Sequence, residues 1–288
     1  MKKRKGQSRR EFLVKAGMLG SLPLLPSPVL SSSKNNKLGA GEKDVKFNIG
    51  VASWGLRKLS FDEVIKAMQD MQLEYISLKS MHLPFDLSAK DLRKRVETMR
   101  DAGLHPYAPG VVYMNSKEEA DMAFEYTKNA DLDMIVGVPA YDIMDYVELL
   151  IKTYNISVAI HCHGPDNLPF PSPEDAFERL EGRDDRFGIC VDVSHVVRSG
   201  MDPVDQLKIV RPRLLDMHIW DVSEASKEGK AVRPGKGVLD FKAILSTLVG
   251  FDYAGSLSIE YGSEAENPVP AYIETKGYIE GVLAGLYS

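Results

Sequence analysis

The sequence predicts a single α/β domain in which eight strands alternate with helices and close into a (β/α)₈ barrel. From Val45 onward, short apolar runs alternate with longer amphipathic segments, and this pattern continues to residue 285. Barrels of this class usually need about 250 residues, which this span matches. An open doubly wound sheet would carry a glycine-rich phosphate loop after its first strand. The segment ASWGLRK (52–58) is not such a loop.

Eight apolar runs are expected to form the barrel strands, and helix signals separate them. The runs cover residues 46–54, 74–80, 105–114, 133–139, 156–163, 187–195, 214–222 and 255–262. Segment 60–71 has acidic residues in its first turn and apolar residues three and four apart. Segment 172–182 begins with a serine N-cap followed by Pro173 and ends on Gly182, and segment 240–253 repeats the helical pattern.

The basic start of the chain is typical of an export signal. SRREFLVK (Ser8–Lys15) resembles a twin-arginine signal, because paired arginines directly precede Phe12 and Leu13. The apolar run that follows is short and contains three prolines, so no stable membrane span is expected. We therefore expect residues 1–43 to be an export signal and linker, residues 44–288 to be the barrel domain, and the protein to be periplasmic. The alternative is a disordered basic tail.

Charge narrows the choice of partners. Residues 1–15 contain seven Lys and Arg against one Glu, a charge of +6, and the whole chain carries −5, so the remainder carries −11. A body this acidic repels phosphate backbones, so nucleic acid is not an expected partner. The sequence is compatible with a homo-oligomer.

The two cysteines are expected to be free thiols. Cys162 alternates with His161 and His163 along its run, whereas Cys190 shares the parity of Asp192. Side chains of alternating residues point to opposite faces of a strand, so the two thiols should not meet.

Imidazole and carboxylate groups end four consecutive predicted strands. They are His161 and His163 on the fifth run, Asp192 and His195 on the sixth, His218 and Asp221 on the seventh, and Glu260 on the eighth. In barrels of this class the carboxyl ends of the strands form the active site, so these groups should converge. A divalent metal ion would neutralise and order such a set.

These motifs resemble those of the sugar phosphate isomerase/epimerase family of xylose isomerase-like TIM barrels. This family includes ketose 3-epimerases and an apurinic endonuclease branch. The resemblance covers residues 45–285. It is carried, in order, by VDVSH for an Asp-x-x-His motif, DMHIWD for a His-x-x-Asp motif, GKGVLDF for a Gly-x-Gly turn and LSIEY for a terminal glutamate.

The resemblance implies a metal site on Asp192, His218 and Glu260, with His195 facing the substrate. The epimerases of the family have a glutamate at the end of strand five as fourth ligand and second acid/base group, and this chain has His161 there. An imidazole can replace that glutamate as a ligand of Zn²⁺, Mn²⁺ or Fe²⁺, but a metal-bound nitrogen cannot act as a base. His163 would then contact His161 or the substrate. The alternative is that both histidines only cap the strand through backbone hydrogen bonds.

Five further residues are candidates for substrate binding. Lys79 and His82 follow the second run, Trp54 follows the first, Trp220 lies on the seventh, and Lys236 belongs to the basic loop 226–237. The tryptophans could stack on a sugar face, and Lys79 and His82 could reach a substrate oxygen. The basic loop that contains Lys236 could clamp an anionic substrate group. Plainer interpretations are a solvated Lys79, a Trp220 packed under a loop and a mobile basic loop.

The residues and the resemblance together imply a metal-dependent isomerase/epimerase-like enzyme that abstracts a proton next to a metal-bound carbonyl, with one divalent ion (Zn, Mn or Fe). The partner that the resemblance implies is a small carbohydrate substrate. Glu260, His195 and His163 are the candidate catalytic acids and bases. One alternative is a lyase or dehydratase that eliminates a β-substituent from a keto-sugar or keto-glycoside. Another is a non-catalytic carbohydrate-binding barrel. Endonuclease activity would need more metal ligands and a basic groove.

Overall fold

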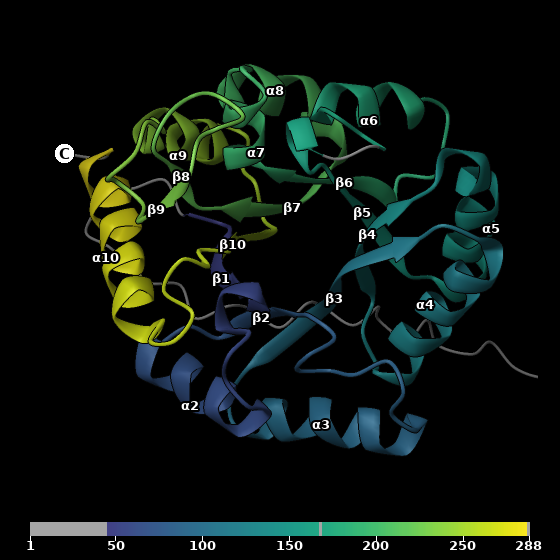
Figure 1. The fold of residues 1–288 in the computed structure, drawn as a ribbon. Coiled ribbons are helices and arrows are strands. Elements are labelled where there is room, and N and C mark those ends of the chain that lie inside the picture. Colours follow the sequence, from purple (N-terminus) through teal and green to yellow (C-terminus); the bar gives the residue numbers. More distant parts are fainter. Residues whose placement is uncertain (1–44, 167–168, 287–288) are drawn as a thin grey trace, which may run out of the picture. The chain divides into compact units, whose positions relative to one another are not determined.

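The computed structural model describes residues 45–166 and 169–286 and contains a closed barrel of parallel strands (Figure 1). The eight barrel strands are β1 (Asn48–Ala52), β2 (Tyr75–Leu78), β3 (His105–Met114), β4 (Met134–Pro139), β5 (Ser157–His161), β6 (Phe187–Asp192), β7 (Leu214–Ile219) and β10 (Ser256–Ile259). Neighbours in the chain pair in parallel, and β1 closes the barrel against β10. The predicted (β/α)₈ fold is confirmed. The predicted export segment, residues 1–43, lies outside the described residues.

Helices surround the ring of strands (Figure 1). They are α2 (Phe61–Met71), α3 (Ala89–Asp101), α4 (Lys117–Asn129), α5 (Met144–Tyr154), α6 (Pro173–Arg179), α7 (Val193–Arg198), α8 (Pro203–Val210), α9 (Phe241–Gly250) and α10 (Val269–Gly285). Short 3₁₀ turns occupy Ser53–Leu56, Tyr141–Ile143, Gly164–Asp166 and Arg211–Arg213. Ser172 caps α6 ahead of Pro173, as the sequence predicts, and Ser60 and Glu63 form a capping box at the start of α2. Within the described ranges, no helix combines the length and apolar character needed to span a bilayer.

Most strands are shorter than the predicted runs, and two of the differences move candidate site residues off the strands. The sixth run was expected to stay extended to His195, but β6 ends at Asp192, whose Oδ1 accepts the N–H groups of Ser194 (2.9 Å) and His195 (3.1 Å) and so starts α7. His195 therefore lies on a short helix beyond the strand. The seventh run was expected to reach residue 222, but β7 ends at Ile219.

Asp221 belongs to a small hairpin beyond β7 and anchors the loop that follows. It lies in β8 (Asp221–Val222), which pairs antiparallel with β9 (Ala231–Val232). Its buried carboxylate accepts backbone N–H groups from Val222, Gly235, Gly237 and Leu239. Asp221, the last residue of DMHIWD, therefore holds the GKG turn through backbone hydrogen bonds.

Candidate metal centre and its pocket

Four side chains meet at the carboxyl ends of neighbouring strands. His161 ends β5, Asp192 ends β6, His218 lies on β7 and Glu260 directly follows β10. One ligand atom from each lies within 4.8 Å of the others. His161 Nε2 is 3.0 Å from His218 Nδ1 and 3.9 Å from Asp192 Oδ2, and His218 Nδ1 is 2.8 Å from Glu260 Oε2. The structure therefore brings together the whole set that the sequence predicted as metal ligands.

The chemistry of these four groups fits a divalent cation. The same nitrogen of His218 faces both His161 Nε2 and Glu260 Oε2, and a single ring proton can serve only one of them fully. Burial, together with neighbouring His163, holds the pKa of His161 well below its usual range, so the imidazole is neutral, as metal binding requires. Burial opposes charge on His218, but Glu260 and Asp216 outweigh it and raise its pKa. The cluster thus favours positive charge at its centre. Two imidazoles and two carboxylates suit Zn²⁺, Mn²⁺ or Fe²⁺.

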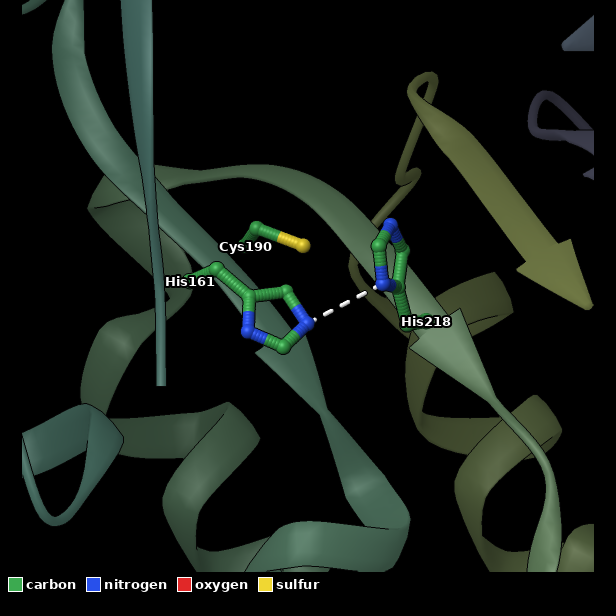
Figure 2. A group of neighbouring side chains, drawn as sticks. All are labelled: His161, Cys190 and His218. Atoms are coloured by element: carbon green, nitrogen blue, oxygen red, sulfur yellow. Dashed lines mark hydrogen bonds between the residues drawn. The ribbon is translucent and has the colours of Figure 1, made fainter. Parts of the chain in front are cut away.

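A thiol lies beside the same two histidines. Figure 2 shows Cys190 next to His161 and His218, and these three residues form a second group with ligand atoms within 4.8 Å. Burial raises the pKa of the Cys190 thiol well above its usual value, and its Sγ donates to Asp216 Oδ2 at 3.6 Å. A protonated thiol is a poor ligand, so the nitrogen and oxygen set is the better metal site. Both cysteines are free and buried, which confirms the prediction of free thiols.

Asp192 and His195 are held by neighbours that define their orientation. The indole Nε1–H of Trp220 donates to Asp192 Oδ2 at 2.9 Å, so this tryptophan fixes a predicted metal ligand. His195 Nε2 lies 3.8 Å from the same oxygen. On the other side of the ring, a guanidinium nitrogen of Arg198 lies 3.4 Å from His195 Nδ1. Arginine only donates, so His195 Nδ1 is the acceptor of this contact and Nε2 is the nitrogen that can carry a proton.

Lys79 and Glu260 form a mostly buried ion pair at the pocket wall. Lys79 Nζ is 3.2 Å from Glu260 Oε1, and their side chains are 15% and 10% exposed. Burial alone would raise the pKa of Glu260, but Lys79 and His218 hold it well below its ordinary value. The carboxylate is therefore ionised. Its two oxygens have different partners, since Oε2 faces His218 and Oε1 faces Lys79.

His163 lies next to His161, two residues after the end of β5. The Nδ1 atoms of the two rings are 3.3 Å apart, and the Tyr113 hydroxyl is 3.4 Å from His163 Nε2. Burial lowers the pKa of His163 to about 4, so the ring is neutral at pH 7. If His161 presents Nε2 to a cation, its Nδ1–H donates to His163 Nδ1, and the proton of His163 then lies on Nε2.

These groups face a cavity of about 760 Å³. Seven of the predicted site residues line it: Trp54, Lys79, His161, His163, His195, Trp220 and Glu260. Asp192 and His218 lie behind this wall and are fully buried. The cavity is thus bounded by the candidate metal centre on one side and by candidate substrate contacts on the others.

Two predicted substrate-binding residues do not line the cavity. His82 is buried, and its ring contacts Ser53 Oγ at 3.0 Å and the carbonyls of Leu56 and Leu59 at 3.2 Å, so it ties the loop after β1 to the loop after β2. Lys236 is largely exposed, and its ammonium lies 4.0 Å from Glu274. Neither His82 nor Lys236 lines the cavity, so the prediction that they contact the substrate there is not supported.

Sequence reasoning missed a buried polar layer beneath the metal ligands. Asp216 Oδ2 is 3.6 Å from His218 Nε2, and Tyr107 donates its hydroxyl proton toward Asp216 Oδ1 at 3.2 Å. Burial raises the pKa of Asp216 to about 6. The strand alternation in LLDMHI already places Asp216 on the face of His218, and this signal could have identified it. At 3.6 Å Asp216 is within ion-pair distance of His218 but makes no hydrogen bond to it, so its contribution is negative charge behind the ring.

The closed barrel and its cluster of imidazoles and carboxylates at the strand ends define a (β/α)₈ barrel with a candidate metal site. The chain matches the xylose isomerase-like TIM barrel family over residues 44–281 and belongs to that family.

Individual relatives are distant. The chain is 27% identical over 149 residues to the inosose dehydratase of Clostridium tetani (strain Massachusetts / E88), a match that covers 46% of this chain and 49%, about half, of that enzyme. The crystal structure of the IOLI protein with a bound zinc atom is 18% identical, with a TM-score of 0.70, over 84% of this chain and 99% of that one. D-psicose 3-epimerase, solved in the presence of D-fructose, is 13% identical, with a TM-score of 0.67, over 83% and 100%. At these identities the solved structures establish a shared fold.

Proposed function

We propose that the protein is a metal-dependent enzyme that acts on a sugar-derived hydroxycarbonyl compound and removes the proton next to its carbonyl group. The observation that carries this proposal is the shared cavity. It is lined by two of the four candidate ligands, by the Lys79–Glu260 pair and by two further histidines, and the other two ligands lie behind its wall. The zinc-bound structural relative supports a metal-dependent enzyme, and the sugar epimerase and dehydratase relatives support a carbohydrate substrate.

The residues divide into an acceptor side and a donor side. Lys79 and Glu260 follow β2 and β10, which both pair with β1, whereas His163 and His195 follow β5 and β6 on another part of the ring. Glu260 Oε1 is the proton acceptor on the first side. His163 and His195 line the second side, and we assign their Nε2–H groups as the donors that hold an oxygen as it gains negative charge.

The Glu260 carboxylate is a weak base, so it can remove the proton only if other groups make the C–H bond more acidic. Lys79 keeps Glu260 ionised, but the same ion pair lowers the carboxylate's affinity for a proton. A divalent ion held by the four ligands would draw charge from a substrate oxygen and so acidify the adjacent C–H bond. The Lys79 ammonium adds positive charge to the same wall.

Elimination is the second candidate outcome, besides isomerisation or epimerisation. The family resemblance implies that epimerases have a carboxylate at the end of strand five, and here His161 and then the donor His163 occupy that side. In elimination, the C–H electron pair forms a C=C bond while Glu260 takes the proton. The β C–O bond breaks, and its oxygen takes a proton from the histidine side, which solvent replaces. An arrangement with Glu260 as base on one side and a histidine as proton donor on the other suits elimination.

Metal-replete protein in heavy water is expected to exchange the α-hydrogen of a keto-sugar or to release the β-substituent of a keto-glycoside. Proton NMR distinguishes the outcomes, because exchange and isomerisation keep all carbon–oxygen bonds and elimination creates a vinyl proton. A panel of 2-keto and 3-keto sugars and their methyl glycosides covers the substrate class. If no member of this panel exchanges, isomerises or eliminates, the carbohydrate-binding alternative replaces the enzyme.

We further propose that residues 1–43 direct export to the periplasm. In a bacterial host with an active twin-arginine pathway, the full chain is expected in the periplasmic fraction, and an Arg9→Lys, Arg10→Lys variant is expected to stay in the cytoplasm. Arg4→Lys is the matched control, because it changes a basic residue of the same segment but leaves the arginine pair. Equal distribution of all three proteins would contradict the signal.

A further inference from the structure

Exposed hydrophobic side chains gather on one side of the pocket mouth. The described residues include ten large hydrophobic side chains with high exposure. Half of them line the main cavity or the smaller cavity beside it: Trp54, Met81, Phe85, Tyr113 and Met122. Exposed apolar groups that cluster around one opening mark a binding surface rather than chance exposure.

The two cavities are adjacent and share part of their walls. The second has a volume of about 330 Å³ and shares Phe85, Val112, Tyr113 and Tyr126 with the first. It runs beside β3, between the loop that follows β2 and helix α4, elements that lie next to one another in Figure 1. We name the part formed by Phe85, Val112, Tyr113, Met122 and Tyr126 the apolar groove.

The walls of the groove suit an uncharged apolar group. The charged residues that line the second cavity are Glu119 and Glu125, and Glu119 accepts hydrogen bonds from the backbone and side chain of Asn115. Negative charge at this end disfavours phosphate or carboxylate ligands. The rings of Phe85 and Tyr126 lie 4.8 Å apart and tilted, and such a wall can pack against another ring.

Tyr113 joins the groove to the donor side of the candidate active site. Its ring stacks on His163 with centroids 5.7 Å apart, and its hydroxyl is 3.4 Å from His163 Nε2. A substituent whose bonding oxygen lies at His163 would therefore extend past Tyr113 into the groove. The main cavity alone is in the range that holds drug-sized ligands, about 300–1,000 Å³, which is more than a single sugar needs.

We infer that the apolar groove binds the aromatic or otherwise apolar aglycone of a glycoside substrate, the group on the far side of the bond that elimination would break. This inference rests on the proposed function, since it places the sugar ring at the metal centre and the departing group beyond His163.

Paired phenyl and methyl pyranosides of the gluco, galacto, manno and xylo series test the groove. They lack the carbonyl, so the metal-loaded full chain binds them without reaction, and calorimetry or saturation-transfer NMR measures their affinity. In at least one series the phenyl compound is expected to bind roughly tenfold more tightly than the methyl compound, because the groove buries its ring. Phe85→Ser and Met122→Ser should each reduce that preference to about threefold or less.

Leu149→Ser is the matched control, because Leu149 is 56% exposed on α5 and lines neither cavity, whereas Met122 is 64% exposed on α4. A methyl compound that binds as well as its phenyl partner in every series, or no binding by any pair, overturns the inference. So does an unchanged preference in both groove variants. A loss of dimers in sedimentation of the Met122→Ser protein, without a change in phenyl preference, would assign the groove to a second copy instead. Tight phenyl binding without hydrogen exchange would contradict the proposed reaction and leave the groove intact.

Discussion

A His218→Ala, Glu260→Ala double variant is expected to retain less than a tenth of the divalent ion that the wild-type chain carries. The wild-type protein, purified without added metal, is expected to contain one ion per chain. The double variant keeps His161 and Asp192, whose facing atoms are 3.9 Å apart, and two protein ligands hold a transition metal poorly. Elemental analysis of dialysed protein measures the ion directly and needs no substrate.

A chemically matched control exists on the surface. His105 Nε2 lies 3.8 Å from Glu74 Oε2, and both side chains are more than half exposed, so this pair has the same groups without the burial or the other two ligands. His105→Ala, Glu74→Ala should leave the metal content unchanged. Metal occupancy that survives in the His218→Ala, Glu260→Ala protein would remove these residues from the site. Urea unfolding of each variant separates loss of the ion from loss of the fold.

The convergence of the ligands could be predicted because a parallel barrel places every strand's carboxyl end at one rim. His161, Asp192, His218 and Glu260 end strands that are neighbours in the ring, so knowing where each strand ends was sufficient to group them. The apolar runs located those ends to within a few residues, and the run 105–114 coincides with β3. Errors arose where a polar side chain ended a strand early, as Asp192 does by capping α7.

Residues beyond the strand ends were harder to place. The spacing of apolar residues predicts strands and helices, but it does not predict the path of a loop or where its side chains point. His82 follows β2 as predicted, yet its ring turns to the carbonyls of the preceding loop. Lys236 lies near Glu274 of α10, a contact that no local pattern reveals. The apolar groove escaped notice for the same reason, since Phe85, Tyr113 and Met122 come from a loop, a strand and a helix. Only tertiary packing brings them to one surface.

Removal of the acceptor carboxylate is expected to have the largest effect on turnover. Glu260→Gln keeps the side-chain shape and an oxygen for the metal, but an amide cannot take the α-proton, so hydrogen exchange should slow by roughly a hundredfold or more. Lys79→Met should slow exchange by roughly tenfold or more, because it removes the positive charge beside the reacting carbon while the carboxylate remains. Exchange rates are compared per bound ion, so that weaker metal binding in either variant is not counted as slower chemistry.

The exposed pair Lys58–Glu266 provides matched controls for both substitutions. Lys58 Nζ lies 3.6 Å from Glu266 Oε1, and this pair repeats the chemistry of Lys79 and Glu260 in solvent. Lys58→Met and Glu266→Gln should each exchange at the wild-type rate, because an exposed ion pair contributes little and neither group lines the cavity. A metal-replete Glu260→Gln protein that exchanges within about threefold of wild type would remove Glu260 as the base. In that case His163 or His195 must take the proton, and the donor and acceptor sides of the pocket would be exchanged.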